Sequence, residues 1–189
     1  ARSRSDHYGY SNIEYFRSPD ACNLHENLGN FDYIVLSAVL EHLLPNERKV
    51  LIPKLWQLLA PGGILFIDQT PFRYFPIEVH TTHLPLINYF PSKLACFCAN
   101  KLKKRGSELD WQNWLRRGIR GATVGELFRI LGHNSRAILL HPKQQGIANR
   151  ADLWFKTAMD RCPKGIKLWG LYLVRWVNYI PGVMMLPEL

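Results

Sequence analysis

Two short runs of apolar residues organise the first part of the chain. Tyr33–Leu36 and Ile64–Ile67 are apolar throughout, which is typical of parallel strands that are buried on both faces. Apolar positions between them have helical spacing, and Pro45 suits the first position of a helix that runs to about Leu59. Strand, helix and strand in this order predict a right-handed parallel unit of an α/β sheet.

Proline and glycine residues mark the breaks in this pattern. Pro53 lies inside the predicted helix, where it removes a hydrogen-bond donor, so we expect it to kink the helix or delay its start. Pro61-Gly62-Gly63 predicts the tight turn into the second strand. Asn12–Phe16 alternates, is rich in strand formers and is followed by Pro19, so a further strand is predicted there.

The second half of the chain is less regular. Residues 68–92 hold four prolines among aromatic and histidine residues, which predicts a long structured loop. A helix is expected from Ser92 to Lys104, and capping-box spacing at Thr123 opens a short helix that ends at Gly132. The remaining predicted elements are a strand over Arg136–Leu140 and amphipathic helices over 149–161 and 166–179.

Composition narrows the class of protein. The 189 residues are 47% hydrophobic and 21% charged, which excludes wholesale disorder. No apolar run reaches the roughly 20 residues of a membrane-spanning helix, and the polar first residues predict no secretory leader. The four cysteines (Cys22, Cys96, Cys98 and Cys162) lack the spacing of a disulfide framework or a zinc finger, so no metal site is expected. The default compartment is the cytoplasm.

The excess of positive charge lies in the second half. Residues 1–100 carry 8 Lys and Arg against 9 Asp and Glu, whereas residues 101–189 carry 16 against 6, a balance of +10. Such asymmetry suits an anionic partner such as a membrane surface, or else reflects solvated helix faces. No DNA- or RNA-binding motif accompanies the charge, so no nucleic-acid partner is expected.

Three motifs occur in a fixed order along the predicted strand–helix–strand unit. They are Phe31-Asp32-Tyr33-Ile34-Val35, Val39-Leu40-Glu41-His42-Leu43 and Leu58-Leu59-Ala60-Pro61-Gly62-Gly63-Ile64-Leu65. Together they resemble class I S-adenosylmethionine-dependent methyltransferases, and most closely the small-molecule type that includes the ubiquinone-biosynthesis methylases. The resemblance covers residues 1–90 well and the remainder loosely. It implies a partial Rossmann-like, doubly wound parallel sheet with C-terminal helices, and S-adenosylmethionine as cofactor.

The resemblance also implies which residues bind the cofactor. Asp20 matches the acidic residue that accepts a hydrogen bond from the adenine amino group, although a turn role after Pro19 is the alternative. The small residues that leave the first strand, where open parallel sheets bind ligands, match those that line the methionine portion. His42 is a further candidate, or else a helix-start residue. The implied cofactor-binding residues are Asp20, Ala21, Cys22, Ser37, Ala38, Val39 and His42.

Acceptor contacts are expected in the loop after the second strand. His80 and His83 are the candidate catalytic bases, because imidazole titrates near neutral pH, with backbone-bonded loop histidines as the alternative. Arg73 is a candidate for holding an anionic group of the substrate, or it pairs with Glu78. Tyr74 is a candidate wall of the substrate pocket, or part of a small core within the loop.

The chain also departs from the family pattern. It has no Gly-x-Gly-x-Gly, and the only glycine before Asp20 is Gly9. We therefore expect a truncated domain that binds S-adenosylmethionine poorly by itself, with a degenerate, non-catalytic binding module as the alternative. Within the single domain 1–189, the predicted parts are a cofactor-side core over 1–70, an acceptor-side loop and helix insertion over 68–121, and C-terminal helices with a strand over 122–189.

The predicted activity of the parent enzyme is methyl transfer to a small-molecule or lipid-like acceptor. Trp, Tyr and basic residues over 166–179 suit a helix at a membrane interface, which implies peripheral membrane contact. A helix that packs on the sheet is the alternative for this segment. Oligomeric state has no signal in the sequence.

Overall fold

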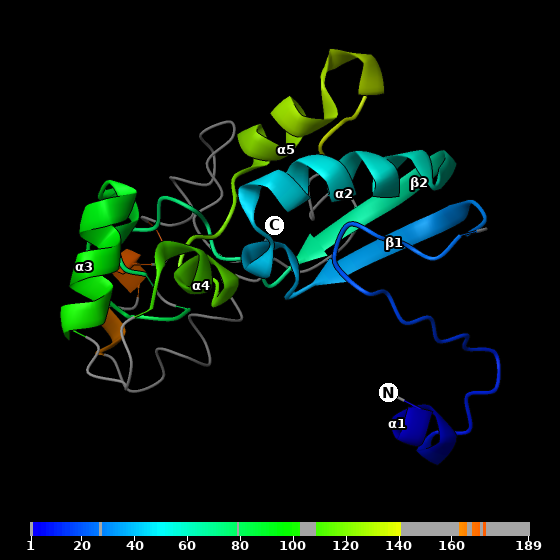
Figure 1. Cartoon of the computed structure of the whole chain (residues 1–189), viewed down its shortest axis with the longest axis horizontal. Coiled ribbons are helices and arrows are strands. Elements are labelled where there is room, and N and C mark those ends of the chain that lie inside the picture. The colour runs from blue at the N-terminus through cyan, green and yellow to red at the C-terminus, as the bar shows by residue number, and fades with distance from the viewer. Residues whose placement is uncertain are drawn as a thin grey trace.

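The predicted strand–helix–strand unit is present. A computed structural model describes residues 2–26, 28–78, 80–102, 109–140, 163–165, 168–170 and 172. Strand β1 (Phe31–Ser37), helix α2 (Pro45–Gln57) and strand β2 (Leu59–Asp68) follow one another, and the two strands pair in parallel (Figure 1). Their register runs from Tyr33 opposite Ile64 to Ser37 opposite Asp68, so the two strands end together at one edge.

Helix α2 begins at Pro45 and continues through Pro53. Its first turn is closed by Glu47, whose Oε2 accepts a hydrogen bond from the Leu44 amide at 2.9 Å. Pro45 occupies the first helical position, where the missing N–H costs nothing. A start delayed to Pro53 is therefore wrong, because the cap and Pro45 together fix the start eight residues earlier.

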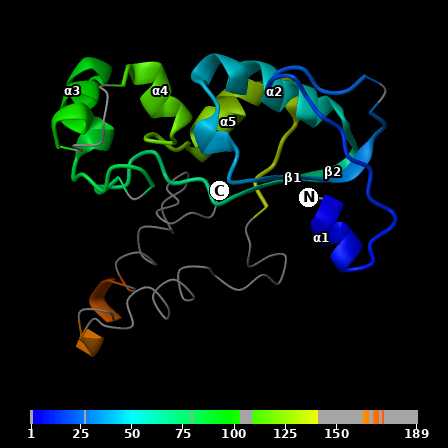
Figure 2. The same cartoon turned by 60° about the horizontal axis from the view of Figure 1, so that its bottom comes forward.

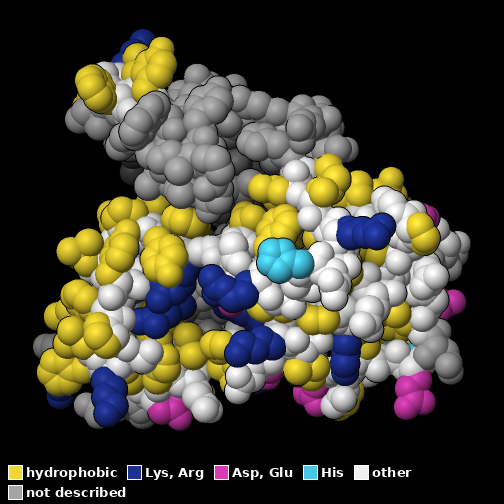
Figure 3. Space-filling model, turned by 90° about the horizontal axis from the view of Figure 1, so that it is seen from above, with side chains coloured by type: hydrophobic (Ala, Val, Ile, Leu, Met, Phe, Trp, Pro, Cys, Tyr) yellow, Lys and Arg dark blue, Asp and Glu magenta, His cyan; other side chains and the backbone are white. Residues whose placement is uncertain are grey.

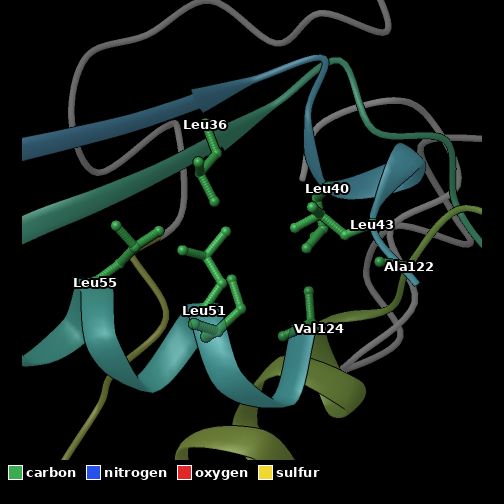
Figure 4. Packing of buried hydrophobic residues seen from close by; sticks show 8 residues of the cluster. Leu36, Leu40, Leu43, Leu51, Leu55, Ala122 and Val124 are labelled. Atoms are coloured by element: carbon green, nitrogen blue, oxygen red, sulfur yellow. The ribbon is translucent and has the colours of Figure 1, made fainter. Parts of the chain in front are cut away.

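The main core lies between the sheet and two helices. Helix α2 and helix α5 (Val124–Leu131) cover the same face of the strand pair (Figure 2). Leu36 points from β1 toward Leu51 and Leu55 of α2, and Val124 closes the cluster from α5 (Figure 4). These side chains are buried, so their removal from water is the main force that holds the unit together.

The opposite face of β1 differs from the sequence-based expectation. Tyr33 is 64% exposed and Val35 is 61% exposed, so burial on both faces is wrong for this strand. An apolar run fits a strand buried on both faces, but only a helix packed on each face produces that burial. In the described part of the chain, α2 and α5 share one face (Figure 2).

Two predicted strands do not form. Residues 12–16 follow helix α1 (Arg2–His7) as exposed, irregular chain, and Tyr15 donates its hydroxyl hydrogen bond to Ser5 Oγ at 2.6 Å. Residues 136–140 are also irregular, after the short 3₁₀ turn η3 (His133–Ser135). Alternation alone does not make a strand, because each strand needs a neighbour for its backbone hydrogen bonds.

A second cluster lies beyond the carboxyl ends of the strands (Figures 1 and 2). It contains the 3₁₀ turn η2 (Ile87–Tyr89), helix α3 (Ser92–Leu102) and helix α4 (Trp111–Arg116), with Trp114 at its centre. The indole of Trp114 donates to Asn100 Oδ1 at 2.8 Å. Helix α3 was predicted and α4 was not, although Asp110 caps α4 by accepting from the Asn113 amide at 2.7 Å.

Of the remaining predicted elements, some are confirmed and others lie outside the described residues. Thr123 caps α5 by accepting from the Glu126 amide at 3.0 Å, and Gly132 ends it with φ +75°, as predicted. The described residues between β2 and α3, 69–78 and 80–91, form the expected loop, with isolated bridges and η2. The helix predicted over 149–161 lies outside the described residues, as does most of that over 166–179. No described helix has the length and apolarity to cross a bilayer.

Candidate active site

The carboxyl ends of β1 and β2 form an edge with small side chains. The Ala38 amide donates to the Asp68 carbonyl at 3.0 Å, and Ser37 Oγ accepts from Gln69 Nε2 at 3.2 Å. Ala38 has φ +53°, a left-handed conformation that costs a residue with a side chain about 1–2 kcal/mol. Ser37 and Ala38 are exposed at this edge, which is where open parallel sheets bind their ligands.

Glu41 lies just behind this edge, in the 3₁₀ turn η1 (Leu40–His42). Its side chain is 0% exposed. Thr70, itself fully buried after β2, donates its hydroxyl hydrogen bond to Glu41 Oε2 at 2.9 Å. The other oxygen, Oε1, is buried and accepts no hydrogen bond from the described residues.

Two histidines from distant segments meet beside Glu41. His42 follows it in η1, and His80 comes from the loop after β2, with the two ring centres 5.2 Å apart. His42 Nδ1 lies 2.9 Å from the Arg116 carbonyl oxygen, and His42 Nε2 lies 3.6 Å from Glu41 Oε1. One donor atom from each of Glu41, His42 and His80 falls within 4.8 Å of the other two.

The buried carboxylate of Glu78 shapes the loop that carries His80. It accepts hydrogen bonds from the His80 amide at 2.7 Å and from the Thr82 hydroxyl at 2.7 Å. Glu78 is therefore used within the loop, and the alternative pairing with Arg73 is wrong. His83 is exposed with φ +55°, and it makes no hydrogen bond or ring contact with the described residues. The structure thus brings His80, but not His83, to His42.

Asp20 forms a turn beside α2, close enough to Lys54 and Glu47 for their charges to act on one another. Its carboxylate accepts from the Cys22 amide at 2.7 Å and from the Asn23 amide at 3.0 Å. These bonds, that from Cys22 first, hold the pKa of Asp20 below its usual value. The Cys22 carbonyl accepts from Lys54 of α2, and Ala21 packs on the core. Among the described residues, no hydrogen bond or ion pair joins Asp20 to Ser37, Ala38 or Val39.

An open pocket of about 620 Å³ lies where α2 begins, between α5 and the loop after β2. Lys49, Arg73 and Arg129 line it, with Tyr74 beside them. Lys and Arg side chains gather around a hollow on the face that carries α5 (Figure 3). Burial lowers the pKa of Arg73, whose guanidinium donates to the Asn88 carbonyl.

The charge of this pocket is positive on balance. Glu126 also lines it, but its carboxylate is held by Arg48 at 3.1 Å. The predicted pair Arg73 and Tyr74 is therefore joined by Lys49 and Arg129, which sequence reasoning missed. Their helical positions carry no signal, because exposed lysines and arginines are common on any helix.

Comparison with known proteins bears on the first third of the chain. Residues 1–67 match the family described as a methyltransferase domain. This segment holds β1, α2 and β2 almost to its end, and the match supports a class I S-adenosylmethionine-dependent methyltransferase with a Rossmann-like fold. Comparisons with curated proteins and with solved structures give no match.

Proposed function

We propose that the protein transfers a methyl group from S-adenosylmethionine to a small-molecule or lipid-like acceptor, in the manner of the ubiquinone-biosynthesis methylases. One observation carries the proposal. The segment that matches the methyltransferase family contains two parallel strands, and their carboxyl edge turns through a left-handed Ala38. Ligands of open parallel sheets bind at this edge.

The residues of the edge fit the methionine portion of the cofactor. Ser37 and Ala38 are small and exposed, and Val39 follows them into η1. Family resemblance adds Asp20, Ala21 and Cys22 on the adenine side and His42 beside η1. When bound, S-adenosylmethionine supplies an electrophilic methyl group on a sulfonium. A glycine-rich loop does not occur in these 189 residues, so weak binding by this chain alone remains our expectation.

The acceptor is held by the chain's own side chains. Lys49, Arg73 and Arg129 suit an acceptor that carries an anionic group, and Tyr74 offers an aromatic wall. A loop histidine, His80 or His83, takes the acceptor proton at a ring nitrogen. Most of the acceleration comes from holding the acceptor in line at contact distance, which is a task for the pocket.

The test is methyl transfer by the protein that the natural reading frame encodes. The protein translated from the whole frame should transfer tritiated methyl from S-adenosylmethionine into an extractable acceptor. Ala38→Val, which places a branched side chain in a left-handed position at the edge, should lower the rate more than about tenfold, whereas Ala38→Gly should retain it.

Absence of methyl transfer would favour a second function. The basic pocket of Lys49, Arg73 and Arg129 supports a non-catalytic module that holds an anionic partner. Such a module would bind its partner without S-adenosylmethionine, and Ala38→Val would leave that binding unchanged.

A further inference from the structure

We propose that Glu41, His42 and His80 form a binding site for a divalent transition-metal ion of the Zn²⁺ type, with a coordination position open to solvent. Nothing in the predicted methyl transfer requires this ion. The inference stands on the geometry behind the strand edge, where one carboxylate and two imidazoles converge.

Burial of the Glu41 carboxylate costs free energy unless a cation or a hydrogen-bond donor lies beside each of its oxygens. Thr70 satisfies Oε2, but Oε1 is buried and has no hydrogen-bond donor among the described residues. A buried carboxylate oxygen without a partner costs several kcal/mol. Oε1 faces the histidine side of the cluster, 3.6 Å from His42 Nε2.

His42 is set in the tautomer of a metal ligand. The Arg116 carbonyl oxygen only accepts hydrogen bonds, so His42 Nδ1, at 2.9 Å, carries the proton. In the neutral ring, Nε2 then presents a lone pair toward Glu41 Oε1, and two acceptors face each other. A cation between them removes the repulsion, and a backbone carbonyl on the second ring nitrogen is the usual outer partner of a metal-bound histidine.

His80 completes the set because the chain makes room for its ring. Gly118, with φ +81°, lies beneath it, and a Cβ at this position would come within 2.6 Å of His80 Cδ2. The same Cβ would lie 3.2 Å from Glu41 Cγ. Glu78 holds the His80 backbone, and Thr81 donates to the Arg117 carbonyl at 2.7 Å, so the loop is tied to the segment that carries Gly118.

The donor set selects the class of ion. Two imidazoles and one carboxylate suit Zn²⁺, Fe²⁺ or Co²⁺, whereas Mg²⁺ and Ca²⁺ prefer oxygen donors. Ligand bonds of roughly 2.1 Å at the tetrahedral angle of about 109° separate two donor atoms by roughly 3.4 Å, and Glu41 Oε1 and His42 Nε2 lie close to this separation, 3.6 Å apart. His42 is 40% exposed and His80 is exposed, so an ion can enter and keep water as a further ligand.

The test is metal binding to the full chain. After removal of metal with a chelator, the chain is titrated with ZnCl₂ by calorimetry, and with CoCl₂ by visible absorption. We expect one Zn²⁺ per chain and a tetrahedral Co²⁺ spectrum. His80→Ala, which removes an exposed ligand, should lower the affinity more than about 100-fold. His133→Ala, at an exposed histidine in η3, is the matched control and should leave the affinity unchanged.

Gly118→Ala should also lower the affinity for Zn²⁺, although it removes no ligand, because its Cβ would displace the His80 ring. Circular dichroism checks that each variant is folded. No one-to-one binding, or equal affinity in His80→Ala and His133→Ala, would overturn the proposal. The readout is binding rather than activity, so its failure does not bear on methyl transfer, and a metal on His80 leaves His83 as the base.

Discussion

Arg48 shows how much of the fold depends on one side chain. It is buried in α2, and its guanidinium donates to the carbonyls of Leu43 and Gly121 at 3.1 Å. It also donates to the Arg120 carbonyl at 3.2 Å and forms the ion pair with Glu126 of α5. The guanidinium of Arg48 therefore connects three separate segments to α2. Its planar arrangement of N–H donors allows these bonds to form together.

Arg48→Met tests this arrangement. Removal of the donors leaves buried carbonyls and Glu126 without their partner, so the free energy of unfolding should fall by about 3–5 kcal/mol. Urea unfolding at neutral pH measures it. Lys49→Met, at the exposed neighbour on the same helix, should change stability by less than about 0.5 kcal/mol. Equal effects of the two variants would mean that Arg48 acts only through its charge.

At the scale of elements, helix α2 tolerates a proline that its sequence predicts to be disruptive. Pro53 lies in the third turn of Pro45–Gln57, and the helix continues past it. The helix survives because its buried side chains, among them Leu51 and Leu55, pack against β1. Tertiary packing therefore outweighs the local cost of the proline.

Pro53→Ala should stabilise the protein by about 1–3 kcal/mol. Alanine restores the N–H donor and removes the ring clash, and the smaller loss from a more flexible unfolded chain subtracts from this gain. Pro45→Ala is the matched control, since at the first helical position it should destabilise by less than about 1 kcal/mol. Urea unfolding compares them. A loss of stability in Pro53→Ala would show that packing of the proline ring dominates.

The contact between α2 and α4 predicts a pH dependence. Arg116 donates to Glu47 Oε2 at 2.6 Å, and this bond is the main reason that the pKa of Glu47 lies below its usual 4.5. The unfolded state therefore takes up the proton at a higher pH than the folded state does. The resulting stabilisation is fully present above pH 4.5 and is lost as the pH falls below it, through the folded pKa.

Glu47→Gln should accordingly unfold more easily than the natural chain at neutral pH. The difference should shrink as the pH is lowered below 4.5. Urea unfolding at a series of pH values measures it, and Arg116→Gln should reproduce the same narrowing. A difference that stays constant with pH would assign the effect to the helix cap at Leu44 rather than to the ion pair.

Elements with purely local signals were predictable from the sequence. The cap at Thr123, the stop at Gly132 and the apolar runs of β1 and β2 gave correct helices and strands. The strands expected at 12–16 and 136–140 did not form, because strand pairing depends on a neighbour that a local pattern does not specify. Helix α4 was not predicted, because the N-cap residue Asp110 is its only local sequence signal.

At the scale of the whole molecule, the sequence predicts one part of the candidate site and not the other. The edge at Ser37–Val39 follows from motifs, because strand ends in a parallel pair meet at one edge. The approach of His80 to His42 does not, because it depends on the path of a long loop over α4. Lys49 and Arg129 joined Arg73 for the same reason: the packing of α5 on α2 brings them together.

The basic second half suggests a membrane-facing segment, which we test through Trp169. Among the described residues, Leu168, Trp169 and Tyr172 are exposed, with Trp169 at 79%. We expect the chain to sediment with vesicles that contain anionic phospholipid, and Trp169→Ala to weaken this binding about tenfold. Tyr8→Ala, at another exposed aromatic residue, is the control. Equal binding of the two variants to the vesicles would contradict a membrane contact through Trp169.

The glycine beneath His80 predicts a pattern in the sequences of relatives. Because a methyl group at position 118 would collide with the imidazole, we expect the two positions to change together. Lineages that keep histidine at 80 should keep glycine at 118, and those that acquire a larger residue there should have abandoned the histidine. Joint retention of the two residues would show which relatives have the Glu41 cluster, whether or not they keep the methyltransferase motifs.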